Sequence, residues 1–197
     1  MPEVLCYGDS NTWGQGDHSI HEGRIPTEKQ WTVLLEGMLG EEYSVTQAGF
    51  SGRVAGDFAA VEERFRGRPD AFEQVYQAAA PVDILVVALG TNDLKEEYGR
   101  SAEQVLADLW WYKDRAEQLN PAGSIIFVTP PPFNAGEELT EVSIQTRSQL
   151  AELIKTSGLV YVEVEGIEIS GDGAHFTHED HVRVATTLYE KIKEIGL

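Results

Sequence analysis

The run Val82–Leu89 is almost continuously apolar, and it limits the possible folds of this 197-residue chain more than any other stretch. Strands that are buried on both faces, in the centre of a parallel sheet, have this composition. Shorter apolar runs at Val4–Tyr7, Tyr43–Thr46, Ser124–Val128 and Leu159–Val164 are predicted to be further strands. The chain is therefore expected to form a sheet with one strongly buried central strand.

Segments with helical periodicity separate these strands. The longest begins at Ser101, where Gln104 stands three residues later and completes a capping box. Thr27 and Thr177 are the predicted N-caps of two other helices, Thr27 with Gln30 in its box position. The expected helical segments are residues 27–40, 57–65, 70–79, 101–120, 139–157 and 177–195. Alternating strands and helices predict an α/β fold, a three-layer α/β/α sandwich around a parallel sheet.

Composition limits the function classes. A net charge of −18 leaves no basic stripe that could neutralise phosphates, which excludes nucleic acid and anionic membrane surfaces as expected partners. The acidity is interpreted as a solubility feature. The single Cys6 lies within a predicted strand and is expected to be a small core residue. We see no signal peptide and no run of about 20 apolar residues, so a cytoplasmic protein is expected.

The first predicted strand ends at Gly8, and Asp9, Ser10 and Asn11 follow at once. In open α/β sheets the chemistry lies just beyond the carboxyl ends of the strands, so Ser10 is a candidate nucleophile. A serine hydroxyl needs a base to take its proton. Asp172 and His175, three residues apart in a glycine-containing loop, have the spacing for a carboxylate that orients an imidazole.

Two other segments contain candidate donors for a developing oxyanion. Gly49–Arg53 includes Gly52, whose backbone N–H is one candidate, and Gly90–Asp93 includes Asn92, whose side-chain amide is another. Together with the N–H of Ser10, these groups suit a tetrahedral intermediate.

These four segments, in this order, resemble the SGNH (GDSL-type) hydrolase family. The name-giving residues map onto Ser10, Gly52, Asn92 and His175, with Asp172 completing the Asp-x-x-His block. Gly-Asp-Ser-Asn-Thr-Trp-Gly, Gly-Thr-Asn-Asp-Leu-Lys and Asp-Gly-Ala-His-Phe-Thr are similar to the arylesterase/acyltransferase branch.

The resemblance implies a single domain over residues 1–197 with a five-stranded parallel sheet in the order 2-1-3-4-5, a flavodoxin-like arrangement. It also implies a catalytic triad of Ser10, Asp172 and His175 and an oxyanion hole of Ser10, Gly52 and Asn92. The expected activity is hydrolysis of short-chain acyl or aryl esters through an acyl-serine, with acyl transfer as a variant and with no metal or organic cofactor. One departure is Gln47, where many relatives carry Asn; this position supports the Gly52 loop.

Bulky residues flank the four blocks and are predicted to contact substrate. They are Trp13, Phe50, Leu94, Phe133 and Phe176. Asp9 is expected to hold its turn, and Asp93 is expected to be a cap or loop anchor. The long polar loop from Gly14 to Pro26 is predicted to be functional or an interaction element.

Other functions remain open. A carbohydrate O-acetyl esterase would use the same triad. A metal-dependent hydrolase would use His175, His178 and His181 with Asp172 and Asp180, although His178 and His181 are predicted to lie on the solvated surface of the last helix. A non-catalytic binding module is the third alternative, which the complete set of polar residues disfavours. The Trp110–Trp111 pair leaves a homo-oligomer open, because an exposed Trp would suggest a contact.

Overall fold

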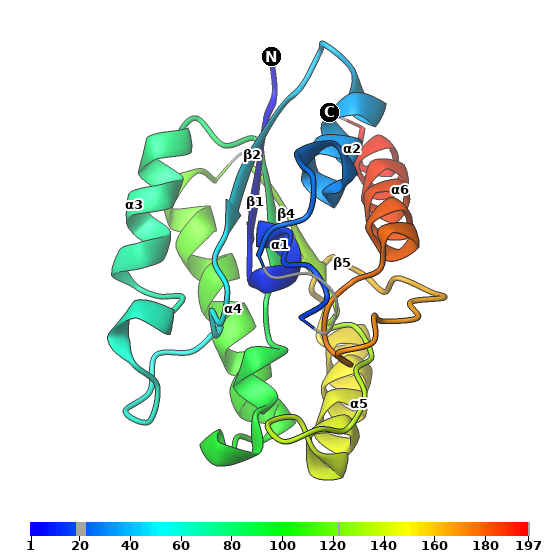
Figure 1. The fold of residues 1–197 in the computed structure, drawn as a ribbon. Coiled ribbons are helices and arrows are strands. Elements are labelled where there is room, and N and C mark those ends of the chain that lie inside the picture. Colours follow the sequence, from blue (N-terminus) through cyan, green and yellow to red (C-terminus); the bar gives the residue numbers. More distant parts are fainter. Residues whose placement is uncertain (19–22, 122, 197) are drawn as a thin grey trace.

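Five parallel strands form one sheet in the order β2-β1-β3-β4-β5 (Figure 1). The computed structural model describes residues 1–18, 23–121 and 123–196. The strands are β1 (Glu3–Gly8), β2 (Ser44–Gly49), β3 (Ile84–Ala88), β4 (Ser124–Val128) and β5 (Tyr161–Val162). The sheet, its direction and its strand order confirm the prediction.

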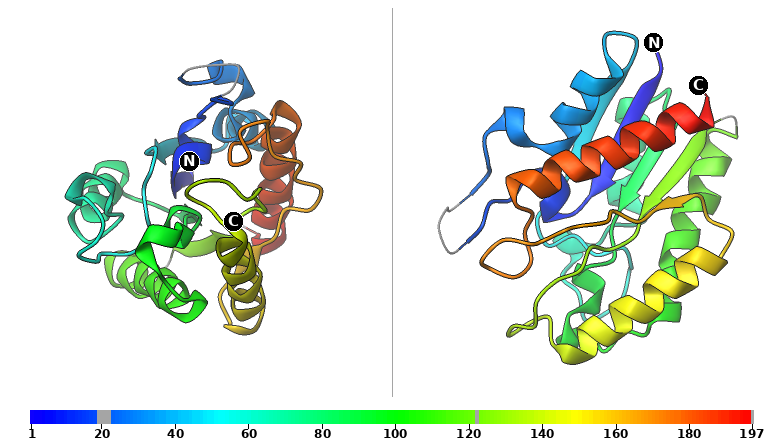
Figure 2. Two further views of the ribbon diagram at one scale, coloured as in Figure 1. Left: turned by 60° about the horizontal axis from the view of Figure 1, so that its bottom comes forward. Right: turned by 90° about the vertical axis from the view of Figure 1, so that its right-hand side faces the viewer.

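Helices cover both faces of this sheet, which makes the predicted three layers (Figure 2). On one face lie α2 (Trp31–Leu39) and α6 (His178–Ile195), and on the other lie α3 (Asp70–Ala79), α4 (Ala102–Leu119) and α5 (Glu141–Thr156). A one-turn helix, α1 (Ser10–Trp13), follows β1 directly. Short 3-10 turns occupy Thr27–Lys29, Glu63–Phe65, Asn92–Leu94 and Glu96–Tyr98.

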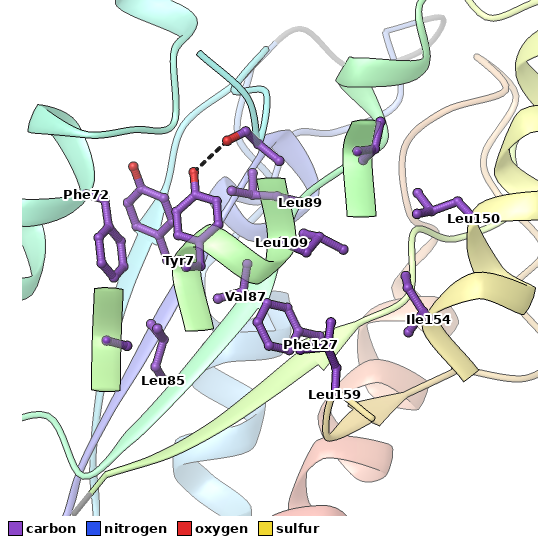
Figure 3. Close-up of a cluster of buried hydrophobic side chains, with 14 of the residues drawn as sticks. Tyr7, Phe72, Leu85, Val87, Leu89, Leu109, Phe127, Leu150, Ile154 and Leu159 are labelled. Carbon is purple, nitrogen blue, oxygen red and sulfur yellow. Dashed lines mark hydrogen bonds between the residues drawn. The ribbon is translucent and has the colours of Figure 1, made fainter. Parts of the chain in front are cut away.

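Alternate residues of β1 enter the two halves of the core, as the two-residue period of a strand requires. Leu5 and Tyr7 pack in the cluster under α3, α4 and α5, where Phe72 and Phe127 join them (Figure 3). Cys6 packs on the opposite face, under α2 and α6, which confirms its prediction as a core residue. Strand β1, which leads to Ser10, is therefore fixed from both sides.

Two helix starts follow their predicted caps. Ser101 accepts a hydrogen bond from the N–H of Gln104, and the side chain of Gln104 accepts one from the N–H of Ser101. Thr177 caps α6 in the same way with Asp180. Both helices begin at the predicted residue because each side chain satisfies a backbone N–H that the first turn leaves free.

The predicted helix over residues 57–65 is wrong, because only the 3-10 turn Glu63–Phe65 forms there. Its apolar residues make contacts outside the segment: the Phe58 ring lies 5.2 Å from the Tyr98 ring, and the Phe65 ring lies 6.2 Å from the Phe50 ring. A backbone bridge joins Val54 to Arg66 and folds the segment back on itself. Tertiary contacts of this kind override helical spacing.

The predicted N-cap at Thr27 is also wrong. Thr27 lies in a 3-10 turn, and α2 begins only at Trp31 because Gln30 has an extended backbone. The Gln30 side chain donates to the carbonyl of Ile25 and accepts from Arg24. Gln30 therefore ties the preceding loop to the helix and does not form a capping box.

Trp110 and Trp111 are both half-buried against the core, and Trp111 packs edge-on against Phe72. Neither ring is the fully exposed Trp that would suggest an oligomer contact. Among the residues that the structure describes, no helix combines the length and apolarity needed to cross a membrane.

Candidate active site

The carboxyl end of β1 is the point where the strand order reverses, with β2 on one side and β3 on the other. Open α/β sheets bind ligands at this position. Gly8 permits the sharp turn there, because a Cβ on it would lie 2.0 Å from Oγ1 of Thr12 and 2.8 Å from the carbonyl oxygen of Ala88. Asp9 caps α1 by accepting the N–H of Asn11 at 3.0 Å, which confirms its predicted role in the turn. Ser10 is then the first residue of α1.

Ser10, His175 and Asp172 form a continuous hydrogen-bonded relay. Nε2 of His175 lies 3.2 Å from Oγ of Ser10, and Nδ1 of His175 lies 2.7 Å from Oδ2 of Asp172. These are the contacts that a nucleophile, a base and an orienting carboxylate need. The structure thus brings together the three side chains that the sequence analysis grouped, and their catalytic roles stay a prediction.

Asp172 is held in its charged form. Burial alone would raise the pKa of its carboxyl, but hydrogen bonds from the N–H of His18, from the ring and N–H of His175 and from the N–H of Ala174 outweigh burial and keep the pKa well below its usual range. The hydroxyl of Ser170 donates a further bond at 2.9 Å. Asp172 is therefore an anion whenever His175 acts as a base.

Asn11 joins the Ser10 turn to the His175 loop, a role that the sequence analysis missed. Its side-chain amide donates to the carbonyl of Ala174 at 3.2 Å and accepts the N–H of Phe176 at 2.9 Å. The residues on either side of His175 are thus bonded to the residue that follows Ser10. The Asn next to Ser10 in the turn was the only sequence signal for this contact.

The predicted oxyanion donors flank Ser10 on both sides. Gly52 follows β2 and Asn92 follows β3, the two neighbours of β1. Gly52 has φ 81° and a Cβ there would lie 2.9 Å from the Phe65 ring, so only glycine fits. One amide proton of Asn92 is used on the carbonyl of Arg53 at 3.1 Å, which leaves the second proton for a substrate. Their function as donors stays a prediction.

Arg53 holds this arrangement together, a structural role that the sequence analysis did not assign. Its guanidinium donates to the carbonyls of Gly8, at 3.0 Å, and Ala48, and lies 4.1 Å from the centroid of the Tyr7 ring. It is only 8% exposed, and burial lowers its pKa. Arg53 therefore ties the ends of β1 and β2 together beside Gly52, and its carbonyl holds Asn92.

Asp93 anchors the loop that follows the Gly52 block. It is fully buried and accepts the N–H groups of Ala55 and Gly56 at 2.7 and 3.0 Å. This confirms its prediction as a loop anchor. The Gln47 side chain instead donates to Gln30 and Thr32, so its bonds support the start of α2.

The five predicted substrate contacts divide into two groups. Leu94, Phe133 and Phe176 are buried and pack in the hydrophobic core, and their contact with substrate stays a prediction. Trp13 is partly exposed, and the Phe50 ring is 41% exposed. Trp13 and Phe50 thus remain the two members of the set that are accessible from solvent.

His178 and His181 were predicted to be exposed to solvent at the start of α6. This is confirmed for His178, which is exposed, but is wrong for His181. His181 is fully buried, and its Nδ1 accepts the N–H of Trp31 at 3.3 Å. It lies three residues beyond His178, on the face that packs against α2. Asp180 is buried as well and accepts backbone N–H groups of Glu168, Ile169 and Thr177. These side chains are structural, and they do not form the metal cluster considered from the sequence.

The buried imidazole of His181 predicts a loss of stability in acid. Burial lowers its pKa to about 4, and His178 acts in the same direction while Asp180 opposes it. Below the ordinary pKa of 6.5 the unfolded chain binds a proton that the folded chain rejects. We expect the free energy of unfolding to fall by up to about 3 kcal/mol through this group between roughly pH 6.5 and 4. Urea unfolding of His181→Asn, whose amide oxygen retains an acceptor for Trp31, should show a flatter pH dependence. His178→Asn removes only one of the smaller contributions to the lowered pKa of His181 and should keep most of the wild-type slope. Equal slopes in the wild type and His181→Asn would contradict this expectation.

This chain is similar to known proteins in sequence and in structure. Residues 6–183 match the model of the GDSL-like lipase/acylhydrolase family. No curated protein matches the sequence. An aryl esterase from M. smegmatis superimposes with a TM-score of 0.85 at 20% identity, covering 98% of this chain and 99% of that chain.

Two Sinorhizobium meliloti structures are also similar. A carbohydrate acetylesterase has a TM-score of 0.85 at 22% identity, over 99% of this chain and 100% of that chain. A carbohydrate acetylesterase family member has a TM-score of 0.81 at 24% identity, over 100% of both chains. At these identities the structural likeness shows a shared fold. The family match spans nearly the whole chain, including all four polar blocks, and this protein therefore belongs to the GDSL-like lipase/acylhydrolase family.

Proposed function

We propose that this protein is a serine esterase that hydrolyses short-chain acyl esters through a covalent acyl-serine intermediate. The observation that carries the proposal is the relay from Ser10 through His175 to Asp172, with contacts of 3.2 and 2.7 Å. Its substrates are small-molecule acetyl or aryl esters. Family membership supports ester hydrolysis, and the aryl esterase among the structural neighbours supports this substrate class.

Acylation follows from the geometry. Oγ of Ser10 attacks the ester carbonyl while Nε2 of His175 takes its proton, and the Asp172 carboxylate stabilises the imidazolium that results. The N–H groups of Ser10 and Gly52 and the free amide proton of Asn92 hold the oxyanion. The alcohol then leaves with the proton from His175, and the acyl group remains on Ser10.

Deacylation uses the same groups. Water gives a proton to His175 and attacks the acyl-serine, which releases the acid and restores the free hydroxyl of Ser10. An acceptor alcohol in place of water would transfer the acyl group, so acyltransferase activity needs no further residue. None of these steps requires a metal or an organic cofactor.

A carbohydrate O-acetyl esterase is the second candidate. Two of the structural neighbours are described as carbohydrate acetylesterases or members of that family. The partly exposed Phe50 ring lies two residues before Gly52 and offers an apolar face on which a sugar ring could pack. The chemistry at Ser10 would be the same, and only the alcohol part of the ester would differ.

We expect the rate to fall as the acyl chain lengthens past butyrate. A cavity of about 20 Å³, room for one water molecule, adjoins Asp9, Asn11 and Thr12, but Ser10 and His175 do not line it. A larger pocket of about 650 Å³ adjoins Ser170 and Gly171, next to Asp172, and Ser10 and His175 do not line it either. Each extra methylene of the acyl chain stabilises the complex by about 0.8 kcal/mol only where the site can bury it. Longer acyl chains should therefore gain no binding energy near Ser10.

The experiment is kcat/KM for p-nitrophenyl esters from acetate to palmitate at one pH, with acetylated xylo-oligosaccharides assayed in parallel. A maximum at acetate or butyrate supports the short-chain esterase. Slow aryl ester turnover with fast acetate release from the sugars would favour the carbohydrate esterase. A maximum at octanoate or longer would overturn the short-chain proposal.

A further inference from the structure

Three side chains that ligate metals meet at the edge of the triad. His18, Asp172 and His175 each present one ligand atom, and these atoms all lie within 4.8 Å of one another. His18 belongs to neither the relay nor the oxyanion hole. Its exposed side chain stands at the solvent side of the two buried or half-buried partners.

Hydrogen bonds between two distant loops bring His18 to this place. The N–H of Gly171 donates to Asp17 at 2.8 Å, and the N–H of His18 donates to Oδ2 of Asp172 at 2.8 Å. The His18 ring then packs edge-on against the His175 ring, with centroids 4.9 Å apart. Part of the long polar loop after Gly14, which the sequence predicted to be functional, is thus fixed directly to the catalytic loop.

We propose that His18, Asp172 and His175 bind Zn²⁺, and that bound zinc switches the esterase off. Two imidazoles and one carboxylate suit zinc better than Mg²⁺ or Ca²⁺, which prefer all-oxygen sites. Tetrahedral zinc needs its ligand atoms about 3.3 Å apart. Where Nδ1 of His175 and Oδ2 of Asp172 are the ligand atoms, this pair, now 2.7 Å apart, separates slightly, and the exposed His18 side chain has only a short distance to move. The net charge of −18 also favours the approach of a cation.

Zinc should inhibit because His175 would be both a zinc ligand and the base for Ser10. The inhibition therefore rests on the proposed function. If Nδ1 binds zinc, its proton is displaced and a neutral ring must carry the proton on Nε2, which then donates to Ser10 and no longer accepts from it. If Nε2 binds zinc, the lone pair that would take the Ser10 proton is occupied. Either way the base is lost, so zinc is an inhibitor here and not a catalytic cofactor.

Binding is tested by calorimetry with zinc chloride alone on the full-length protein after removal of metals. The wild type should bind one zinc. His18→Ala should bind about 10- to 100-fold more weakly or not at all. Loss of a residue that only hydrogen-bonds to a zinc ligand already weakens binding by about this factor. His178→Ala is the matched control: it removes an exposed histidine three residues from His175 but outside the cluster, and it should bind like the wild type. Ser10→Ala should also bind zinc, because the nucleophile is not a ligand.

Inhibition is measured for each active variant against its own rate in chelator. The zinc concentration for half inhibition should rise about 10- to 100-fold in His18→Ala and stay unchanged in His178→Ala. Magnesium chloride should inhibit neither. Chelator alone should leave the wild-type rate unchanged or raise it.

Three results would overturn the proposal: no zinc binding by the wild type, equal binding by the wild type and His18→Ala, or zinc binding without inhibition. Failure of the proposed function is a separate outcome, because calorimetry needs no substrate. If the protein binds zinc through His18 but hydrolyses no ester, the zinc site is supported and the proposed esterase function is wrong. Activity that disappears in chelator and returns with zinc would instead make zinc a cofactor and overturn the inhibitory role.

Discussion

Ser10→Ala is expected to lower the turnover of p-nitrophenyl acetate by about 10⁴- to 10⁶-fold. The variant lacks the only hydroxyl within hydrogen-bond distance of Nε2 of His175 among the described contacts. Loss of the nucleophile from a Ser-His-Asp relay leaves only the residual catalysis of the oxyanion hole and of binding. The assay is kcat/KM at pH 8 with enough enzyme to detect the residual rate.

Stability must be followed in the same variant. The hydroxyl group is a small part of the contacts that hold α1, since Asp9 caps the helix and Asn11 bonds to the His175 loop. We therefore expect a Tm close to that of the wild type. A folded Ser10→Ala protein with near wild-type activity would contradict the serine mechanism.

Asn92→Ala should lower kcat by about 10²- to 10³-fold, the usual effect of removing one oxyanion donor. KM should change much less, because the amide stabilises charge that develops only in the transition state. The measurement is a full kcat and KM determination with p-nitrophenyl acetate.

The control for this experiment is Asn134→Ala. Asn134 is an exposed Asn in the loop after β4, and among the described contacts it bonds to the His175 loop through its backbone N–H, at the carbonyl of Gly173. Its kcat should stay near the wild-type value. An Asn92→Ala variant with unchanged kcat and a raised KM would make Asn92 a ground-state binding residue, because a lost oxyanion donor cannot give that pattern.

The sheet and most helices could be predicted because short apolar runs and helix-capping residues are visible within a few neighbouring positions of the sequence. The apolar run around β3 and the capping box of Ser101 each specify a structure without help from distant residues. The predictions were wrong where contacts with distant residues determine the local structure. Residues 57–65 have helical spacing, yet Phe58 and Phe65 pack against Tyr98 and Phe50, which no local pattern shows. The edge strand β5 pairs over only two residues, Tyr161 and Val162, although the apolar run is longer.

The proximity of Ser10, Asp172 and His175 could be predicted because each residue lies in a loop that follows a strand at the same edge of the sheet. The supporting residues could not, since their roles depend on contacts across the fold. Arg53 had no assigned role until its bonds to the ends of β1 and β2 were visible. His181 was placed on the surface because position on a helix does not reveal which face meets α2. His18 contacts Asp172 and His175 from more than 150 residues away in the chain.

Rapid acid quenching detects an acyl group on Ser10 if the ester is cleaved through a covalent intermediate. The wild type is mixed with excess p-nitrophenyl acetate, quenched at short times and analysed by intact mass spectrometry and peptide mapping. We expect a gain of one acetyl group, located on the peptide that contains Ser10 and absent from Ser10→Ala. Turnover of the ester with no covalent adduct at any time, or with an adduct on another residue that is lost when that residue is replaced, would contradict it.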